Sequence, residues 1–256
     1  MPKTGFRPEK NGFAFINSWQ FDTYDEQRLE GAITGAVGDA VGSLSGGAGR
    51  VVKNSLSGQV RSWLKQSAPS DYGLCGGMAF SARDYFVAKI PLPRGRDVND
   101  RPDPNLPQGK ALRDYLWKRQ LESLSLNAPK LLSSMFMLHL PDFLAGPDWL
   151  LDRTKEEWTR LKAHLDNDGP WPICLIGSST SPFNNHQVLA YGYDEGQNGT
   201  GTIYVYDMNG PNREQTIHLD LSGRILQAIE SCPNPQRGAL RGFFAEAYSP
   251  IVPPTL

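Results

Sequence analysis

The chain has 256 residues, of which 39% are hydrophobic and 21% charged, and its formal net charge is -1. This length and composition indicate an ordinary globular protein with one large domain and argue against intrinsic disorder. No basic block suggests nucleic acid or an anionic membrane as a partner, and the four histidines and three cysteines have no metal-ligand spacing, so neither a metal nor another cofactor is expected.

The N-terminal segment lacks the apolar core of a signal peptide, so we expect cytoplasmic residence, with signal-independent export left open. The aromatic segment 12–21 predicts a strand. Residues 31–56 are rich in Gly and Ala, with glycines recurring every four residues, but Asp39 interrupts a run too short to span a bilayer. We therefore expect an insertion in a soluble fold. Contact of residues 31–49 with a membrane or a partner helix is the alternative.

Apolar residues at helical spacing follow, and Cys75 stands at the start of one such segment. The Pro-rich segment 91–108 predicts a loop. In the last helical segment, Thr154 and Glu157 have the spacing of a capping box, with Thr154 as N-cap. The expected helices are 59–66, 76–90, 109–124, 130–140 and 152–170.

Strand patterns separated by Gly- and Asn-rich turns occupy the rest of the chain. The expected strands are 171–179, 186–194, 200–208, 214–221 and 240–248. Helices followed by an antiparallel sheet predict the α+β class. We expect a single domain over residues 1–256, with a mainly helical lobe at 70–168 and a β lobe at 169–250.

Cys75 is the candidate nucleophile. A cysteine at a helix N-terminus feels the positive end of the helix dipole, which favours the thiolate. His186 opens an apolar strand, and Asp207 ends the next one. In an antiparallel pair these two residues would lie close together, so that the carboxylate orients the imidazole as a catalytic base requires. Asn209 is the alternative orienting group.

Each of these residues also has a structural interpretation. Cys75 considered alone would more often be a buried structural thiol. The structural alternative for Asp207 is a cap of the turn that follows it, and for His186 a hydrogen bond within the core. Cys174, inside an apolar strand, is expected in the core, and Cys232 at the surface or in a loop.

The segments GLCGGMAF and NHQVLAYGYD, followed by IYVYD, resemble the papain-like cysteine peptidase superfamily and its bacterial branch. That family places its Cys on the first helix of one lobe, its His at a strand start and an Asn or Asp at the end of the next strand. The resemblance covers roughly residues 70–88 and 171–210. It implies a papain-like fold and a cysteine-dependent hydrolase of peptide or amide bonds. Its triad would be Cys75, His186 and Asp207, and its substrate a peptide or protein.

The chain departs from that family at the oxyanion hole. The family places a Gln about six residues before the Cys, where this chain has Pro69. The hole would then combine the Cys75 backbone N–H with a side chain. Asn17 is the first candidate for that side chain, and Gln20 and Gln66 are the others. The family's Trp after the third catalytic residue is also missing.

Two other classes of function remain open at this stage. Cys-His-Asp triads on adjacent strands also serve transglutaminases and arylamine acetyltransferases, so acyl transfer is one alternative. The other is a catalytically silent papain-like module that acts by binding, or as an effector. The missing glutamine favours the silent module, whereas amine-dependent product formation would favour transfer.

Overall fold

The computed structural model describes residues 4–20, 71–139, 148–181 and 184–256. Several of the predictions above fall outside these ranges: the insertion 31–56, the helix 59–66, Gln66 and Pro69.

The helices of the described residues are α1 (Pro8–Asn11), α4 (Cys75–Ala88), α5 (Pro107–Leu138) and α7 (Trp149–Asn167). Helix α4 begins at Cys75 and buries Met78, Ala82 and Tyr85, as the apolar spacing predicts. It ends where Lys89 takes a left-handed conformation with φ of 56°. None of the described helices combines the length and apolar character needed to cross a bilayer.

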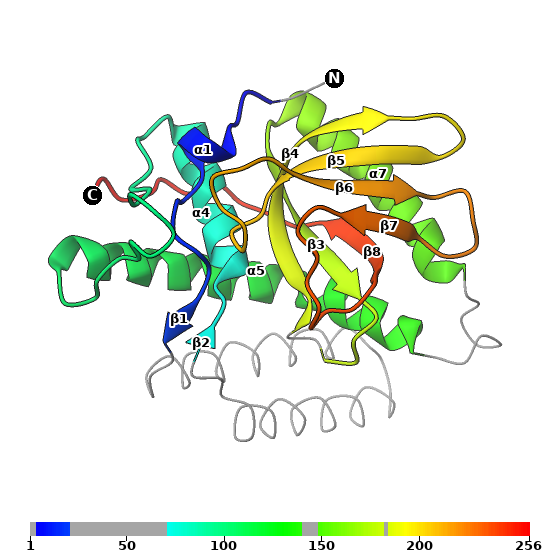
Figure 1. Ribbon diagram of the computed structural model, residues 1–256, viewed down its shortest axis with the longest axis horizontal. Helices are drawn as coiled ribbons and strands as arrows, with labels where there is room; N and C mark the ends of the chain where they lie inside the picture. The colour runs from blue at the N-terminus through cyan, green and yellow to red at the C-terminus, as the bar shows by residue number, and fades with distance from the viewer. Residues whose placement is uncertain (1–3, 21–70, 140–147, 182–183) are drawn as a thin grey trace.

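A six-stranded antiparallel sheet has the strand order β7-β6-β5-β4-β3-β8. Its strands are β3 (Trp171–Gly177), β4 (His186–Glu195), β5 (Thr200–Tyr206), β6 (Gln215–Asp220), β7 (Gln227–Glu230) and β8 (Leu240–Ala245). The edge strands β7 and β8 also contact each other, so the sheet curls (Figure 1). A separate pair joins β1 (Trp19–Gln20) to β2 (Asp71–Tyr72). The architecture is therefore α+β, as the sequence predicts.

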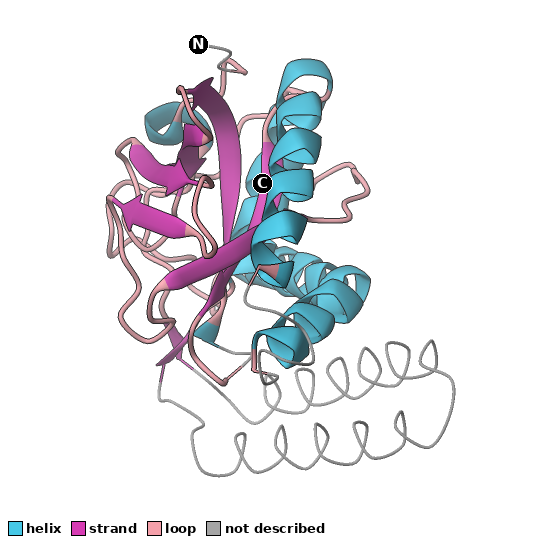
Figure 2. Cartoon of the chain, turned by 90° about the vertical axis from the view of Figure 1, so that its right-hand side faces the viewer, coloured by secondary structure: helices cyan, strands magenta, loops and turns pink. Residues whose placement is uncertain are grey.

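Alternate residues of β4 and β5 enter two different cores, because successive side chains of a strand point to opposite faces. Val188 and Val205 lie in a core with Trp158 and Leu161 of α7. Helix α7 lies along one side of the strands (Figure 2).

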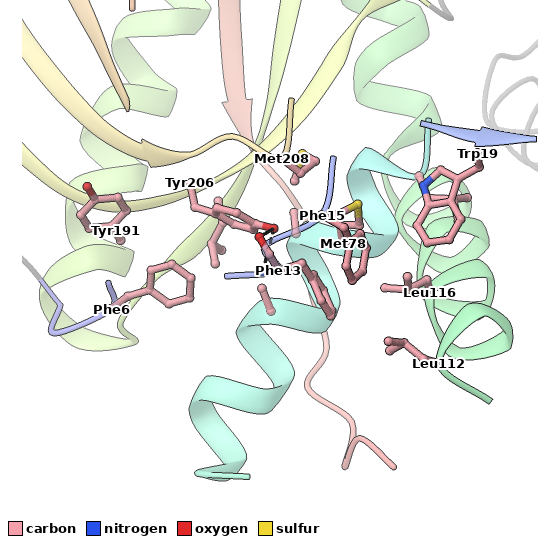
Figure 3. Packing of buried hydrophobic residues seen from close by; sticks show 14 of the residues in the cluster. Phe6, Phe13, Phe15, Trp19, Met78, Leu112, Leu116, Tyr191, Tyr206 and Met208 are labelled. Atoms are coloured by element: carbon pink, nitrogen blue, oxygen red, sulfur yellow. Dashed lines mark hydrogen bonds between the residues drawn. The ribbon is translucent and has the colours of Figure 1, made fainter. Parts of the chain in front are cut away.

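The other core contains Tyr206 of β5, Met78 of α4 and the aromatic side chains of the N-terminal segment. Phe6, Phe13 and Phe15 lie between the sheet and α4 (Figure 3). The hydroxyl of Tyr206 accepts a hydrogen bond from the Phe13 backbone N–H at 3.0 Å. Burial of each apolar side chain of this size stabilises the folded state by about 1.5–3 kcal/mol. The N-terminal segment is thereby fixed against the helix that carries Cys75.

The predicted strand 12–21 is wrong over most of its length, because among its described residues, 12–20, only Trp19 and Gln20 form a strand. The backbone N–H groups of Ala14 and Ile16 donate to the carbonyls of Arg94 and Val98, in the irregular segment before α5. The segment therefore satisfies its backbone without a sheet ladder.

The two helices predicted at 109–124 and 130–140 are one continuous helix, α5, with Pro129 inside it. A proline in a helix interior removes one backbone hydrogen bond. On both sides of Pro129, hydrogen bonds to another part of the chain hold the helix in place. Asn127 exchanges hydrogen bonds with the backbone of Ala247, and Lys130 donates to the Ala245 carbonyl.

The predicted capping box is also wrong. Helix α7 begins at Trp149, and Thr154 lies inside it, where its hydroxyl donates to the Leu150 carbonyl at 2.7 Å. Glu157 instead accepts the Ala245 backbone N–H at 2.9 Å and pairs with Lys130. Its role is therefore to join α7 to β8 and α5.

The two glycines after Cys75 permit close packing of α4. A Cβ on Gly77 would lie 2.2 Å from the backbone oxygen of Leu116, and one on Gly76 would lie 2.0 Å from Oε1 of Gln187. Both sites face the protein interior. They therefore serve the packing of α4 rather than an open space beside Cys75.

We predict that Gly77→Ala lowers the free energy of unfolding by about 1–3 kcal/mol, because the clash with a helix backbone outweighs the gain in helix propensity. Urea denaturation measures the change. Gly223→Ala is the matched control: its Cβ would meet nothing nearer than the Ile225 carbonyl oxygen at 3.6 Å, so the change should stay within about 0.5 kcal/mol. Equal stability of Gly77→Ala and wild type would contradict this packing of α4 on α5.

Candidate active site

Cys75 is the first residue of α4 and is partly exposed. Its position leaves its own backbone N–H without a partner inside the helix. The backbone N–H of Gly77, two residues further along the helix, donates to Oε1 of Gln120 at 2.9 Å. The thiol therefore lies at the positive end of a 14-residue helix, beside backbone donors that point out of it.

His186 and Asp207 are brought together by the pairing of β4 with β5. Leu189 lies opposite Tyr206, which places the start of β4 beside the residue that follows β5. Nε2 of His186 lies 2.9 Å from Oδ1 of Asp207, and both side chains are about 95% buried. The hydrogen bond that the sequence predicted across the strand pair is therefore present.

Charge and burial act in opposite directions on this pair. Burial alone lowers the pKa of His186, but the Asp207 carboxylate outweighs it and holds that pKa well above its ordinary value. Burial alone raises the pKa of Asp207, but the His186 charge and several hydrogen bonds hold it below its usual range. At neutral pH the pair is an imidazolium and a carboxylate.

The Cys75 side chain lies close enough to His186 to contribute, after Asp207, to the raised pKa of that histidine. Because Nε2 is taken by Asp207, the ring nitrogen left for the thiol is Nδ1. The sulfur of Cys75 also lies 3.9 Å from Oε1 of Gln187. The three residues predicted as a triad thus form one connected chain of contacts.

Asn17 lies at the entrance to α4. Its Oδ1 accepts the Leu74 backbone N–H at 2.6 Å and the Trp19 ring N–H at 3.2 Å. Two donors on the oxygen fix the orientation of the amide, so Nδ2 points away from them. Nδ2 lies 3.4 Å from Oδ1 of Asn209, which leaves its second N–H free of that contact. Asn17 therefore bonds to Leu74, the residue before Cys75, and has an amide N–H group to donate, whereas Gln66 lies outside the described residues.

The carboxylate of Asp207 has further partners. Its Oδ1 accepts the Asn209 backbone N–H at 2.8 Å, and the Cys232 thiol also hydrogen-bonds to it. The side-chain Nδ2 of Asn209 is 3.4 Å from Nε2 of His186, so Asp207 makes the shorter contact of the two candidates. Cys232 is half-buried against Asp207 rather than on the surface.

A buried polar network lies behind Cys75. Nε2 of Gln187 donates to Oε1 of Glu246, and Oε1 of Gln187 accepts from Ser123 at 3.3 Å and from Gln120 at 3.4 Å. Burial raises the pKa of Glu246 to about 8 against the opposing effects of Gln187 and Lys130, so this carboxyl is largely neutral at pH 7. Its Oε2 has no hydrogen-bond partner among the described residues.

The sequence did not predict the contacts of Gln187, Glu246 and Cys232. One signal was present: Gln187 is a polar residue within a strand whose next residues, Val188 and Leu189, are fully buried. The partner of that side chain, 59 residues away, left no local pattern.

Among the described residues no three His, Cys, Asp or Glu side chains cluster closely enough to hold a metal ion. Compared with known protein families, curated proteins and solved structures, the chain matches none of them. The geometry of the site is therefore the guide to its chemistry.

We predict that Glu246 makes the protein less stable as the pH rises. Its pKa is raised on folding from about 4.5 to about 8, so its stabilising effect is complete below pH 4.5 and is lost as the pH rises through 8. Between pH 5 and 8 the free energy of unfolding of wild type should fall relative to Glu246→Gln, by about 1 kcal/mol per pH unit. Urea denaturation at several pH values tests this; parallel curves for the two proteins would contradict it.

Proposed function

We propose that the chain is a papain-like cysteine hydrolase that cleaves peptide or amide bonds. The observation that carries the proposal is the chain of contacts from Cys75 to His186 to Asp207 at the start of a helix. A nucleophile, a base and a group that orients the base are the parts that covalent acyl chemistry requires.

In the first step the Cys75 thiolate attacks the substrate carbonyl carbon, and a carbon–sulfur bond forms. The imidazolium of His186 then donates the proton at Nδ1 to the leaving nitrogen, the carbon–nitrogen bond breaks and the amine departs. The product on the enzyme is a thioester of Cys75. Asp207 keeps Nε2 of His186 engaged, so that Nδ1 faces the reacting atoms throughout.

In the second step neutral His186 takes a proton from water through Nδ1, and the hydroxide attacks the thioester carbonyl. The carbon–sulfur bond breaks, and the acid leaves with Cys75 restored as a thiolate beside the imidazolium. The balance needs only substrate and water. No cofactor enters either step.

The negative oxygen that forms in both steps needs donors. The donors that we assign to it are the Cys75 backbone N–H at the helix start and Nδ2 of Asn17, whose Oδ1 accepts the N–H of the preceding residue, Leu74. Donors held in place before the reaction stabilise such an oxygen by about 3–4 kcal/mol each.

Selective alkylation tests the nucleophile. With iodoacetamide near pH 6, Cys75 should react far faster than Cys174 or Cys232, because burial raises the pKa of Cys174 well above its usual range and that of Cys232 to about 11. Mass spectrometry of the digested protein locates the label. His186→Ala should slow the labelling of Cys75 by about 10²-fold or more. Equal labelling of Cys75 and Cys232, or no effect of His186→Ala, would exclude Cys75 as the nucleophile.

The same site chemistry allows an amine to replace water in the second step. With p-nitrophenyl acetate as the probe, hydrolysis releases acetate whether or not an amine is present. An amide product formed only when an amine is added would assign acyl transfer instead.

We predict that Asn17→Ala lowers kcat for hydrolysis of p-nitrophenyl acetate by about 10²-fold and leaves alkylation of Cys75 by iodoacetamide within a few-fold of wild type. Alkylation forms no oxyanion, so it reports the nucleophile alone. Asn184→Ala, which removes an amide bonded to Ser179, is the control and should change neither rate. An equal loss of both activities in Asn17→Ala would show that Asn17 only supports the position of Cys75.

A further inference from the structure

The turn that follows β5 contacts both halves of the candidate site. It closes with a hydrogen bond from the Gly210 backbone N–H to the Asp207 carbonyl at 3.1 Å. Inside the turn, the Asn209 backbone N–H donates to Oδ1 of Asp207 at 2.8 Å. The Met208 carbonyl accepts the Asn17 backbone N–H at 3.1 Å, and the Met208 side chain is fully buried. The backbone of this turn is therefore fixed between the Asp207 carboxylate and the segment that carries Asn17.

The orientation of the Asn209 side chain is set by Asn17. Oδ1 of Asn17 accepts the N–H groups of Leu74 and Trp19, at 2.6 and 3.2 Å. Its Nδ2 is therefore the end that faces Asn209. An amide nitrogen donates and does not accept, so the atom of Asn209 that lies 3.4 Å from it is the oxygen Oδ1. A flipped Asn209 would set two NH₂ groups against each other.

The other end of the Asn209 amide faces His186. Its Nδ2 lies 3.4 Å from Nε2 of His186. That Nε2 lies closer, at 2.9 Å, to Oδ1 of Asp207, and a ring nitrogen that donates to a carboxylate has no lone pair with which to accept a second bond. Asn209 therefore does not orient His186. The end of its amide that makes a hydrogen bond is the oxygen, and that bond is with Asn17.

Gly73 limits the space on another side of the Asn17 amide. A Cβ on Gly73 would lie 2.9 Å from Nδ2 of Asn17, which is closer than such atoms approach in proteins. Nδ2 therefore lies between Asn209 and the residues that lead into Cys75. The two N–H bonds of an amide nitrogen lie in one plane, so a bond from one of them to Asn209 sets the direction of the other.

We propose that Asn209 is a positioning residue, which accepts one N–H of Asn17 and so directs the other at the oxygen that becomes negative during the reaction. The inference rests on the proposed function, because Asn17 has this role only in a reaction that forms such an oxygen. Through its two bonds, Asn209 holds the donor, Asn17, in a fixed position relative to Asp207, which orients the base.

A double-mutant cycle on hydrolysis of p-nitrophenyl acetate by the full chain tests this. Asn209→Ala removes the amide and keeps the backbone N–H that Asp207 accepts. Its kcat should fall about three- to tenfold, the effect of one neutral hydrogen bond. Its KM and the alkylation of Cys75 by iodoacetamide should not change. Because Asn209 acts through Asn17, the double variant Asn17→Ala/Asn209→Ala should be no slower than Asn17→Ala alone.

Asn209→Asp is the matched variant, because a carboxylate keeps an acceptor for Nδ2 of Asn17. It should restore most of the kcat that Asn209→Ala loses. Asn105→Ala removes an exposed amide that bonds to Asp103 in another loop, and as the control it should change neither kcat nor alkylation.

Gly73→Ala tests the direction of the Asn17 amide from the opposite side. The nearest atom to the added methyl group is the end of a side chain rather than backbone, so the amide moves and the fold does not. We expect kcat to fall while alkylation of Cys75 keeps the rate of wild type.

Four results would overturn the inference while the proposed function stands. The first two are an unchanged kcat in Asn209→Ala or in Gly73→Ala. The third is a double variant in which the losses of Asn17→Ala and Asn209→Ala multiply. The fourth is slower alkylation of Cys75 in Asn209→Ala, which would show that Asn209 acts on His186. Ester hydrolysis that survives Cys75→Ala would overturn the proposed function, and the inference with it.

Discussion

The hydrogen bond between His186 and Asp207 is the interaction on which the site depends. Two buried charges are costly to remove from water, and the cost is offset only when the geometry is good and the remaining polar atoms are satisfied. The register of β4 on β5 supplies the geometry, and the Asn209 N–H and the Cys232 thiol satisfy the carboxylate. With Nε2 held in this way, the orientation of the ring and the direction of Nδ1 follow.

The helix and the N-terminal segment bring the other groups to that nitrogen. Gly77 allows α4 to pack directly on α5, which fixes the height of Cys75 beside the sheet. The buried aromatic residues Phe13 and Phe15 hold the segment that carries Asn17, and Asn17 in turn accepts the N–H of Leu74. The same apolar contacts that form this core therefore also position Cys75, the candidate nucleophile, and Asn17.

Features that depend on neighbours in sequence were predictable, and features that depend on the path of distant segments were not. The start of α4, the apolar faces of the helices and the His186–Asp207 pair follow from periodicities and from antiparallel pairing. The contacts of Gln187 with Glu246 and of Cys232 with Asp207 depend on where β8 and the loop before it return. The helix limits predicted for α5 and the capping box predicted for α7 are wrong, because local patterns do not show how these residues bond: Asn127 bonds to the backbone of Ala247 beside Pro129, and the Thr154 hydroxyl bonds to the Leu150 carbonyl inside α7.

The central claim is that Asp207 keeps His186 charged beside Cys75, and a titration of the His186 ring nitrogens by ¹⁵N NMR tests it most directly. The account predicts that His186 is still doubly protonated at pH 8, well above the ordinary histidine pKa of about 6.5, and that Asp207→Asn brings its titration down. Titration of His186 near 6.5 in the wild type, unchanged by Asp207→Asn, would contradict the account.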